Sequence, residues 1–131
     1  GNYTVSLNEE WTNSAYLLGR LFATLEKVQQ DAASGAKLSA TIRDRYFGAA
    51  SATPRNVFPV LLRLAQHHIG KAEYGGIADR QIEAIVGRLD GFPAHLNLEE
   101  QGNFVLGYYH QRQDFYRKRS PETQETAGEG Q

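Results

Sequence analysis

The side chains that could do chemistry in this sequence are mainly cationic, and their spacing suits phosphate binding better than catalysis. One set recurs at multiples of four residues and so lies along one face of a predicted helix: Arg55, Arg63, His67 and Lys71. Such a row can bind nucleic-acid phosphates without reading base identity. A charged row is also the usual solvent-facing side of a surface helix, and both interpretations stay open at this point.

Two further pairs of cations lie in predicted helices nearer the N-terminus. Arg20 and Lys27 are seven residues apart and form a second cationic face. Arg43 and Arg45 flank Asp44, where an ion pair within the turn is the alternative to a ligand contact. These pairs extend the predicted nucleic-acid surface beyond a single helix.

The last predicted helix interleaves aromatic and basic residues and ends in Tyr116, Arg117 and Lys118. Aromatic and basic side chains together can stack on bases and neutralise a single nucleic-acid strand. Cations are also favoured at any helix C-terminus, so a structural role is the alternative for this cluster. The residues predicted to bind nucleic acid are therefore Arg20, Lys27, Arg43, Arg45, Arg55, Arg63, Lys71, Arg117 and Lys118.

Catalytic chemistry is not predicted from the residues. The chain has no cysteine, no serine in a Gly-x-Ser-x-Gly pattern and no phosphate-binding loop around residues 70–72. His67 and His68 are adjacent, so on a helix they point about 100° apart and cannot bind one metal together. Glu99 and Glu100 are helix neighbours that do not face each other. We expect no catalytic residue, metal or cofactor, and a protein that is not an enzyme.

Length and composition favour one compact domain. The chain has 131 residues, of which 40% are hydrophobic and 22% charged, which is ordinary for a soluble globular protein. The longest aliphatic runs, such as residues 60–62, are far shorter than the roughly 20 residues that span a membrane. The absence of cysteine fits a reducing compartment, and we expect a cytoplasmic protein with no membrane partner.

The charge is distributed unevenly along the chain. Fourteen Lys and Arg against fifteen Asp and Glu give a net charge of −1. All fourteen cations and ten of the acids lie in residues 11–119, so this body carries 14 − 10 = +4. A basic body between acidic ends is compatible with a nucleic-acid partner.

Apolar residues at helical spacing predict five helices. The first covers residues 14–33, with Ser14 or Thr12 as its N-cap. The second runs from a cap at Ser39 to near Thr53, and the third covers residues 54–69, with Pro59 predicted to kink it or to separate its first turn. The fourth covers about residues 77–89 before Gly91, and the fifth covers residues 98–119 after a capping box at Asn97.

These elements indicate an all-α protein, a compact bundle of about five helices. Residues 1–13 are predicted to form an N-terminal arm and residues 14–119 the bundle. Residues 120–131 are acidic and nearly without apolar side chains, so we expect a disordered tail.

Several long strings resemble one known family. They are AYLLGRLFATLEK at 15–27, TIRDRYFGAASATP at 41–54, VFPVLLRLAQHH at 57–68, FPAHLNLEEQG at 92–102 and GYYHQRQ at 107–113. In this order they resemble the C-terminal region of the large subunit of the type I-C CRISPR Cascade, over about residues 14–119. In that family the same region is also made as a separate small subunit, which a chain of 131 residues resembles more than a whole large subunit.

The resemblance implies a helical, non-enzymatic subunit of a crRNA-guided complex. Its expected partners are the backbone subunits, the large subunit, a neighbouring copy of itself and target DNA, above all the non-target single strand. Its expected role is to line the belly of the complex and to stabilise the R-loop, in which base pairing with the guide reads the sequence. The alternative is a purely structural assembly module that touches no nucleic acid.

One hypothesis about DNA contacts follows from the helical spacing. Changing Arg63 and Lys71 to alanine is expected to weaken R-loop formation and to make it less salt-dependent. Arg20 and Lys27 are expected to contact DNA in the same way.

Overall fold

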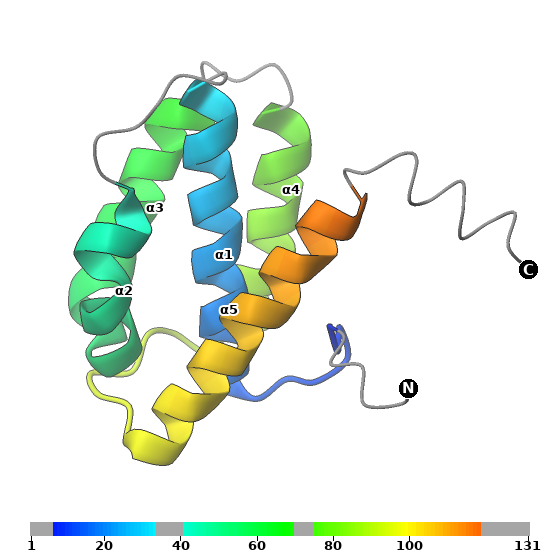
Figure 1. The fold of residues 1–131 in the computed structure, drawn as a ribbon. Helices are drawn as coiled ribbons and strands as arrows, with labels where there is room; N and C mark the ends of the chain where they lie inside the picture. The colour runs from blue at the N-terminus through cyan, green and yellow to red at the C-terminus, as the bar shows by residue number, and fades with distance from the viewer. Residues whose placement is uncertain (1–6, 34–40, 70–74, 119–131) are drawn as a thin grey trace, which may run out of the picture.

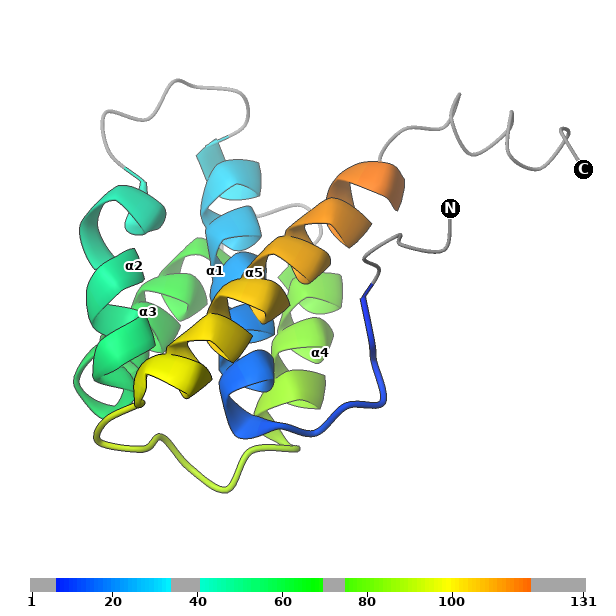
Figure 2. The same cartoon turned by 60° about the horizontal axis from the view of Figure 1, so that its bottom comes forward.

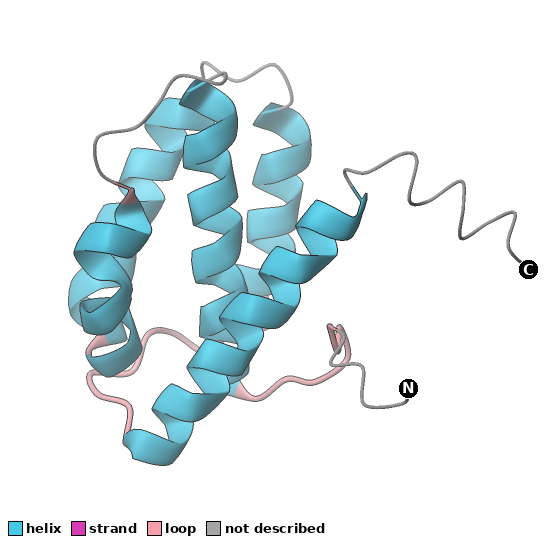
Figure 3. Ribbon diagram, in the orientation of Figure 1, coloured by secondary structure: helices cyan, strands magenta, loops and turns pink. Residues whose placement is uncertain are grey.

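The computed structural model describes residues 7–33, 41–69 and 75–118, and the regular structure in these ranges is entirely helical (Figure 3). The helices are α1 (Ser14–Ala33), α2 (Ile42–Ala52), α3 (Pro54–Ile69), α4 (Gly75–Val86) and α5 (Leu98–Lys118). The predicted all-α bundle of five helices is therefore confirmed. The tail predicted to be disordered lies outside the described residues.

Helix α1 is the centre of the bundle. In Figure 1, α2 and α3 lie on one side of α1, α4 lies on the other, and α5 crosses in front. Residues 15–26 of α1 are all buried, and α1 packs against each of the other four helices. A helix that is apolar nearly all round belongs in the interior, which explains why this segment carries so few charges.

Two glycines set the distance between α1 and α5. A Cβ atom added at Gly19 would lie 2.0 Å from the backbone oxygen of Phe104, and one added at Gly107 would lie 2.1 Å from the backbone oxygen of Tyr16. No other residue type fits at these positions without moving a backbone. The close crossing, visible in Figure 2, therefore depends on having no side chain at either site.

Aromatic rings from four helices fill the centre of the core. They are Phe22 of α1, Phe47 of α2, Phe58 of α3, and Phe104 and Tyr108 of α5. The Phe22 ring meets the other four edge-on at centroid distances of 5.4–6.4 Å, and Phe47 lies 5.0 Å from Tyr108. These edge-to-face contacts add to the apolar burial. They hold α2 against α5, which matters for the surface described below.

The N-caps were only partly predicted. Asn97 and Glu100 form the predicted capping box, with two reciprocal hydrogen bonds of 2.8 Å. The cap of α1 is Asn13, whose Oδ1 accepts from the backbone N–H of Tyr16 at 3.1 Å, so the prediction of Ser14 or Thr12 was wrong. The cap of α2 is Thr41 in a capping box with Asp44, so the prediction of Ser39 was wrong as well.

The other differences concern α3 and α4. Helix α3 is continuous through Pro59, so the alternative of a separate first turn was wrong. Leu64 of α3 is 41% exposed, because the buried row of this helix is Val57, Leu61 and Ala65 at steps of four. Helix α4 begins two residues before Ile77 and ends three residues before Leu89, a shift typical of helix ends.

The loop between α4 and α5 returns to the α2–α3 junction. The backbone N–H of Arg55 donates to the oxygen of Pro93 at 3.0 Å, and that of Leu96 donates to the oxygen of Ala52 at 2.9 Å. The ring of Phe92 stacks on Phe58 at 5.5 Å. These contacts fix where α5 starts and so aim it across α1.

Candidate nucleic-acid interface

Four side chains form an exposed aromatic and basic surface where α2, α1 and α5 meet. We call it the aromatic–basic row and define it as Arg43 of α2 with Tyr109, Arg112 and Tyr116 of α5. The α5 members are three and four residues apart, so they share one side of the helix. Tyr109 and Tyr116 are 38% and 41% exposed, and seven helical residues separate them by about 10 Å.

Arg43 is held in place by aromatic rings. Its guanidinium donates to the hydroxyl of Tyr109 at 2.6 Å. The carbon of that guanidinium lies 5.6–5.9 Å from the ring centroids of Phe47, Tyr108 and Tyr109. Arg43 sits in the first turn of α2, whose start is fixed by the Thr41 capping box. The result is an exposed cation whose position is largely preset before any ligand arrives.

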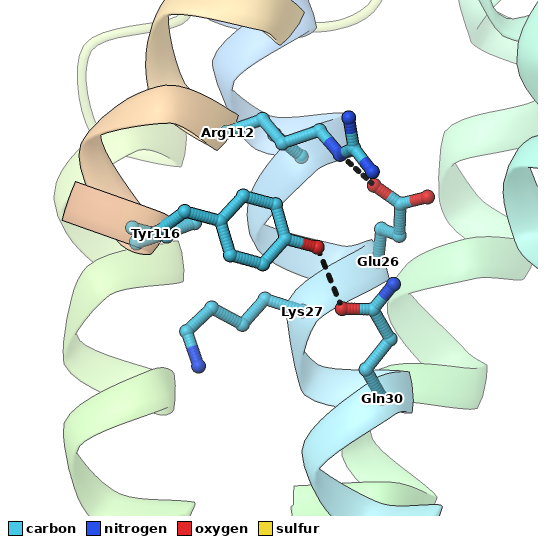
Figure 4. Close-up of a pocket in the computed structure, with 7 residues that line it drawn as sticks. Glu26, Lys27, Gln30, Arg112 and Tyr116 are labelled. Atoms are coloured by element: carbon cyan, nitrogen blue, oxygen red, sulfur yellow. Dashed lines mark hydrogen bonds and ion pairs between the residues drawn. The ribbon is translucent and has the colours of Figure 1, made fainter. Parts of the chain in front are cut away.

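Arg112 and Tyr116 form the second half of the row (Figure 4). The Arg112 guanidinium lies over the Tyr116 ring at 5.1 Å, and the Tyr116 hydroxyl donates to Oε1 of Gln30 at 3.4 Å. Arg112 Nε lies 3.9 Å from Oε1 of Glu26, too far for a hydrogen bond, and has no such bond to any described residue. Nε of Arg112 is buried, so only the partly exposed end of this side chain can meet a ligand.

A buried carboxylate supports the row from below. Glu26 is 4% exposed, and its Oε1 accepts a 2.7 Å hydrogen bond from the Tyr108 hydroxyl. Burial, and then the neighbouring Glu26, raise the pKa of Tyr108 well above its ordinary value. Tyr108 is therefore a neutral donor at any physiological pH, and it holds the carboxyl group of Glu26 in place beneath Arg112.

The surface between these residues has no deep cleft. The hollow lined by Glu26, Lys27, Gln30, Arg112 and Tyr116 has a volume of only about 10 Å³, roughly the space for one water molecule. Lys27 at its edge pairs with Asp31 at 2.7 Å and lies 5.8 Å from the Phe115 ring. The row can therefore serve as a platform for stacking and phosphate contacts, but not as a pocket for a small molecule.

The structure brings together only some of the residues predicted to bind nucleic acid. Arg43 lies in the row and Lys27 lies beside it. Arg45, Arg55, Arg63 and Arg117 are exposed. Lys118 ends α5, but its side chain is not described, and Lys71 lies outside the described residues.

Arg20 does not share an exposed face with Lys27, so that expectation was wrong. The Arg20 side chain is only 8% exposed, and its Nε donates to Oε1 of Gln111 at 2.9 Å. Because α1 is buried on nearly every side, a cation in its middle meets another helix rather than solvent.

The cationic row predicted on α3 is a separate surface. Arg55, Arg63 and His67 are exposed, as expected for one solvent-facing side. Arg55 Nε donates to the backbone oxygen of Phe92 at 3.3 Å. Helix α3 packs against α1, α2 and α4, and it meets α5 in the core, where the rings of Phe58 and Phe104 are 6.4 Å apart. The α3 cations and the aromatic–basic row therefore present two alternative paths for a nucleic-acid strand.

Sequence reasoning did not single out Tyr109 and Arg112. The signal was present in the spacing of Tyr109, Arg112 and Tyr116, which follow one another at steps of three and four residues along one helix side. It could not show that this side faces solvent while Tyr108, one residue earlier, fills the core. It also could not show that Arg43 from another helix completes the row.

Two structural tests address other kinds of site. In residues 7–33, 41–69 and 75–118, no three His, Asp or Glu side chains are grouped to hold a metal ion. None of the helices in the same ranges has the length and apolar character of a membrane span.

Comparison with known proteins identifies the class of protein. The family described as CRISPR-associated protein (Cas_Csd1) matches residues 1–116, most of the chain. The protein is thus a CRISPR-associated protein. More particularly, the chain belongs to the Cas_Csd1 family. A comparison with curated proteins gives no match.

Proposed function

We propose that this chain is the non-catalytic small subunit of a crRNA-guided type I-C CRISPR complex in the cytoplasm. In this role it lies against the backbone subunits, the large subunit and a neighbouring copy of itself. Its aromatic–basic row binds the single DNA strand displaced in the R-loop. Membership of the Cas_Csd1 family supports the CRISPR setting. The resemblance of the sequence strings to the C-terminal region of the type I-C large subunit supports the assignment to the small subunit.

The observation that carries the DNA contact is the fixed geometry of the row. Arg43 is bonded to Tyr109, and Arg112 lies over Tyr116, so two cations and two exposed rings alternate along one surface. A single strand offers phosphates and base faces in the same alternation, and stacking on an aromatic side chain contributes about 1–3 kcal/mol per base. Because the cations are already held over rings, little side-chain freedom is lost on binding.

The experiment compares two surfaces in the assembled complex. Arg43→Ala with Arg112→Ala removes two cations from the row, and Arg55→Ala with Arg63→Ala removes two from the exposed side of α3. We expect the first pair to weaken R-loop formation. The slope of the logarithm of the binding constant against the logarithm of the salt concentration should become shallower by about 1.4, since each lost single-strand phosphate contact contributes about 0.7. If both double variants weaken R-loop formation equally, the assignment of the DNA contact to the aromatic–basic row is wrong.

A purely structural assembly module is the second candidate, and one observation favours it. Val60 and Leu64, one turn apart on α3, are 36% and 41% exposed in the single chain, and Ile77 of α4 is 50% exposed. Exposed apolar side chains of this size suit a protein contact. In that case, omitting the subunit would dissociate the complex before DNA is added, whereas loss of DNA binding by an intact complex supports the first candidate.

A further inference from the structure

The side of α5 that faces away from the bundle is almost free of charge. Figure 1 and Figure 2 both show α5 lying across the front of α1, with this side of the helix turned outward. The exposed uncharged residues of α5 follow one another at steps of three and four, so they form one strip along the helix. We call this strip the outer face of α5, and within residues 98–117 it consists of Leu98, Gly102, Leu106, Tyr109, Gln113 and Tyr116.

The outer face has the character of a protein contact. A surface helix normally turns charged side chains to solvent, whereas the only exposed charged residues of α5 within residues 98–117 are Glu99 and Arg117. Leu98 is 84% exposed and Leu106 is 44% exposed, so both leave large apolar side chains in water. A partner helix laid along the outer face would remove this apolar surface from water.

The pattern of exposed residues is its own complement. The eight exposed positions between residues 98 and 117 are symmetric about the midpoint between residues 107 and 108. A second copy whose α5 lies antiparallel to the first therefore matches each uncharged member of the outer face with another: Leu106 with Tyr109, Gly102 with Gln113, and Leu98 with Tyr116. A two-fold dimer requires such a self-complementary face, and an unrelated partner protein would not require it.

The two charged residues favour the same antiparallel arrangement. Glu99 and Arg117 are eighteen residues apart, or about five full turns, so they lie on the same edge of the outer face. Neither forms an ion pair with another described residue. In the antiparallel pair, Glu99 of each copy lies beside Arg117 of the other copy. A parallel pair would set like charges against each other and align the two helix dipoles, which is unfavourable.

We propose that two free copies of this chain pair through antiparallel α5 helices and thereby cover the aromatic–basic row. Tyr109 and Tyr116 belong both to the row and to the outer face, so a copy cannot pair in this way while a DNA strand is stacked on these rings. The pairing follows from the geometry of α5 alone, whereas the competition with DNA rests on the proposed function. Self-association would then keep exposed aromatic side chains covered until a strand replaces the second copy.

The size of the outer face indicates a weak dimer. A helix of 21 residues is about 31 Å long and about 10 Å wide, so one copy contributes on the order of 300 Å². Stable interfaces bury about 800 Å² on each partner. We therefore expect a dissociation constant between about 1 μM and 1 mM, which is weak enough for DNA to compete.

The first test measures the mass of the full chain by sedimentation equilibrium from about 10 μM to 1 mM, a range that brackets this affinity. We expect a monomer that becomes a dimer as the concentration rises. Leu106→Lys places a charge in the middle of the outer face and should weaken the dimer at least tenfold. Leu64→Lys is the matched control, because Leu64 is 41% exposed on α3 and should leave the dimer unchanged. A chain that stays monomeric at the highest concentration, or equal weakening by both variants, overturns the inference.

A charge exchange tests the antiparallel orientation. Glu99→Arg alone and Arg117→Glu alone each set like charges together and should weaken the dimer. The double variant restores two contacts between opposite charges, so it should recover most of the affinity. Both positions are exposed, and circular dichroism shows whether each variant keeps its helices. A double variant no better than the single variants overturns the antiparallel pairing.

An oligothymidylate of about ten nucleotides, within the usual site size for a single strand, separates this inference from the proposed function. We expect the oligonucleotide to convert the dimer into a monomer bound to DNA. A dimer that binds the oligonucleotide without dissociating overturns the covering of the row. If the chain forms the dimer but binds no oligonucleotide, the proposed DNA contact is wrong and the pairing stands. If it binds the oligonucleotide but never forms a dimer, the pairing is wrong and the DNA contact stands.

Discussion

Replacing Gly107 by alanine tests the helix crossing on which both proposed surfaces depend. The added Cβ would lie 2.1 Å from the backbone oxygen of Tyr16 and 2.9 Å from its carbonyl carbon. These are backbone atoms, so no side-chain rotation relieves the overlap, and α5 must move away from α1. Overpacking of this kind costs typically 1–3 kcal/mol, and we take about 3 because backbone must shift. Alanine regains about 1 kcal/mol of helix propensity, which leaves a net loss of about 2 kcal/mol.

Gly102→Ala is the matched control in the same helix. A Cβ atom at Gly102 meets no atom within 4 Å, so only the propensity gain of about 1 kcal/mol remains. Urea unfolding followed by circular dichroism gives both free energies of unfolding, and we expect them to shift in opposite directions. A Gly107→Ala chain as stable as the Gly102→Ala chain would falsify the close crossing of α1 and α5.

Substitutions at three further positions of α5 test its contacts one side chain at a time. Tyr108→Phe removes the donor to buried Glu26 and should lower the free energy of unfolding by about 2 kcal/mol, the usual range for a hydrogen bond to a charged group, as measured by urea unfolding. Burial lowers the pKa of His110, so below about pH 6.5 the unfolded chain takes up a proton that the folded chain resists. Stability should therefore fall between pH 7 and pH 5, followed by the fluorescence of the single Trp11, which packs on Tyr16, and His110→Asn should flatten this profile. Tyr116→Phe should keep the affinity for single-stranded DNA while Tyr116→Ala loses about tenfold in fluorescence anisotropy, since only the second removes the stacking ring, and equal affinities would exclude stacking there.

The fold was predictable where local signals and apolar periodicity agree. Asn97 and Glu100 stand three residues apart just before a helical pattern, and they form the capping box that this spacing predicts. Helix α1 was predicted at Ser14–Ala33, its observed bounds. The caps at Asn13 and Thr41 were missed because Ser, Thr and Asn stand within two or three residues of one another there, and any of them can cap a helix.

The position of a helix within the bundle was harder to predict than its existence. Arg20 was assigned to an exposed face because it is seven residues from Lys27, yet periodicity cannot tell a surface helix from a central one. A signal was available: residues 15–25 contain no charged side chain other than Arg20. Such a segment buries all of its sides, so its lone cation has to meet a neighbouring helix.

The aromatic–basic row and the Arg20–Gln111 contact could not be predicted from the sequence, because each joins residues far apart in the chain. Arg43 reaches Tyr109 across 66 residues, and Arg20 reaches Gln111 across 91. The two residues of each pair lie on different helices, so no helical spacing in the sequence indicates that they meet. Both pairs exist because α1 and α5 cross closely and because Phe47 packs on Tyr108.

The same crossing places different side chains of α5 on its two flanks. Along α5, Arg112 and Tyr116 face one flank of the α1–α5 seam, Gln111 and Asp114 face the other, and Phe115 lies between them. Stacking on Tyr116 and a phosphate contact at Arg112 would both be independent of the base sequence. Contacts that do not depend on base identity would suit the proposed role, because in a guide-RNA complex the sequence is read by pairing with the guide.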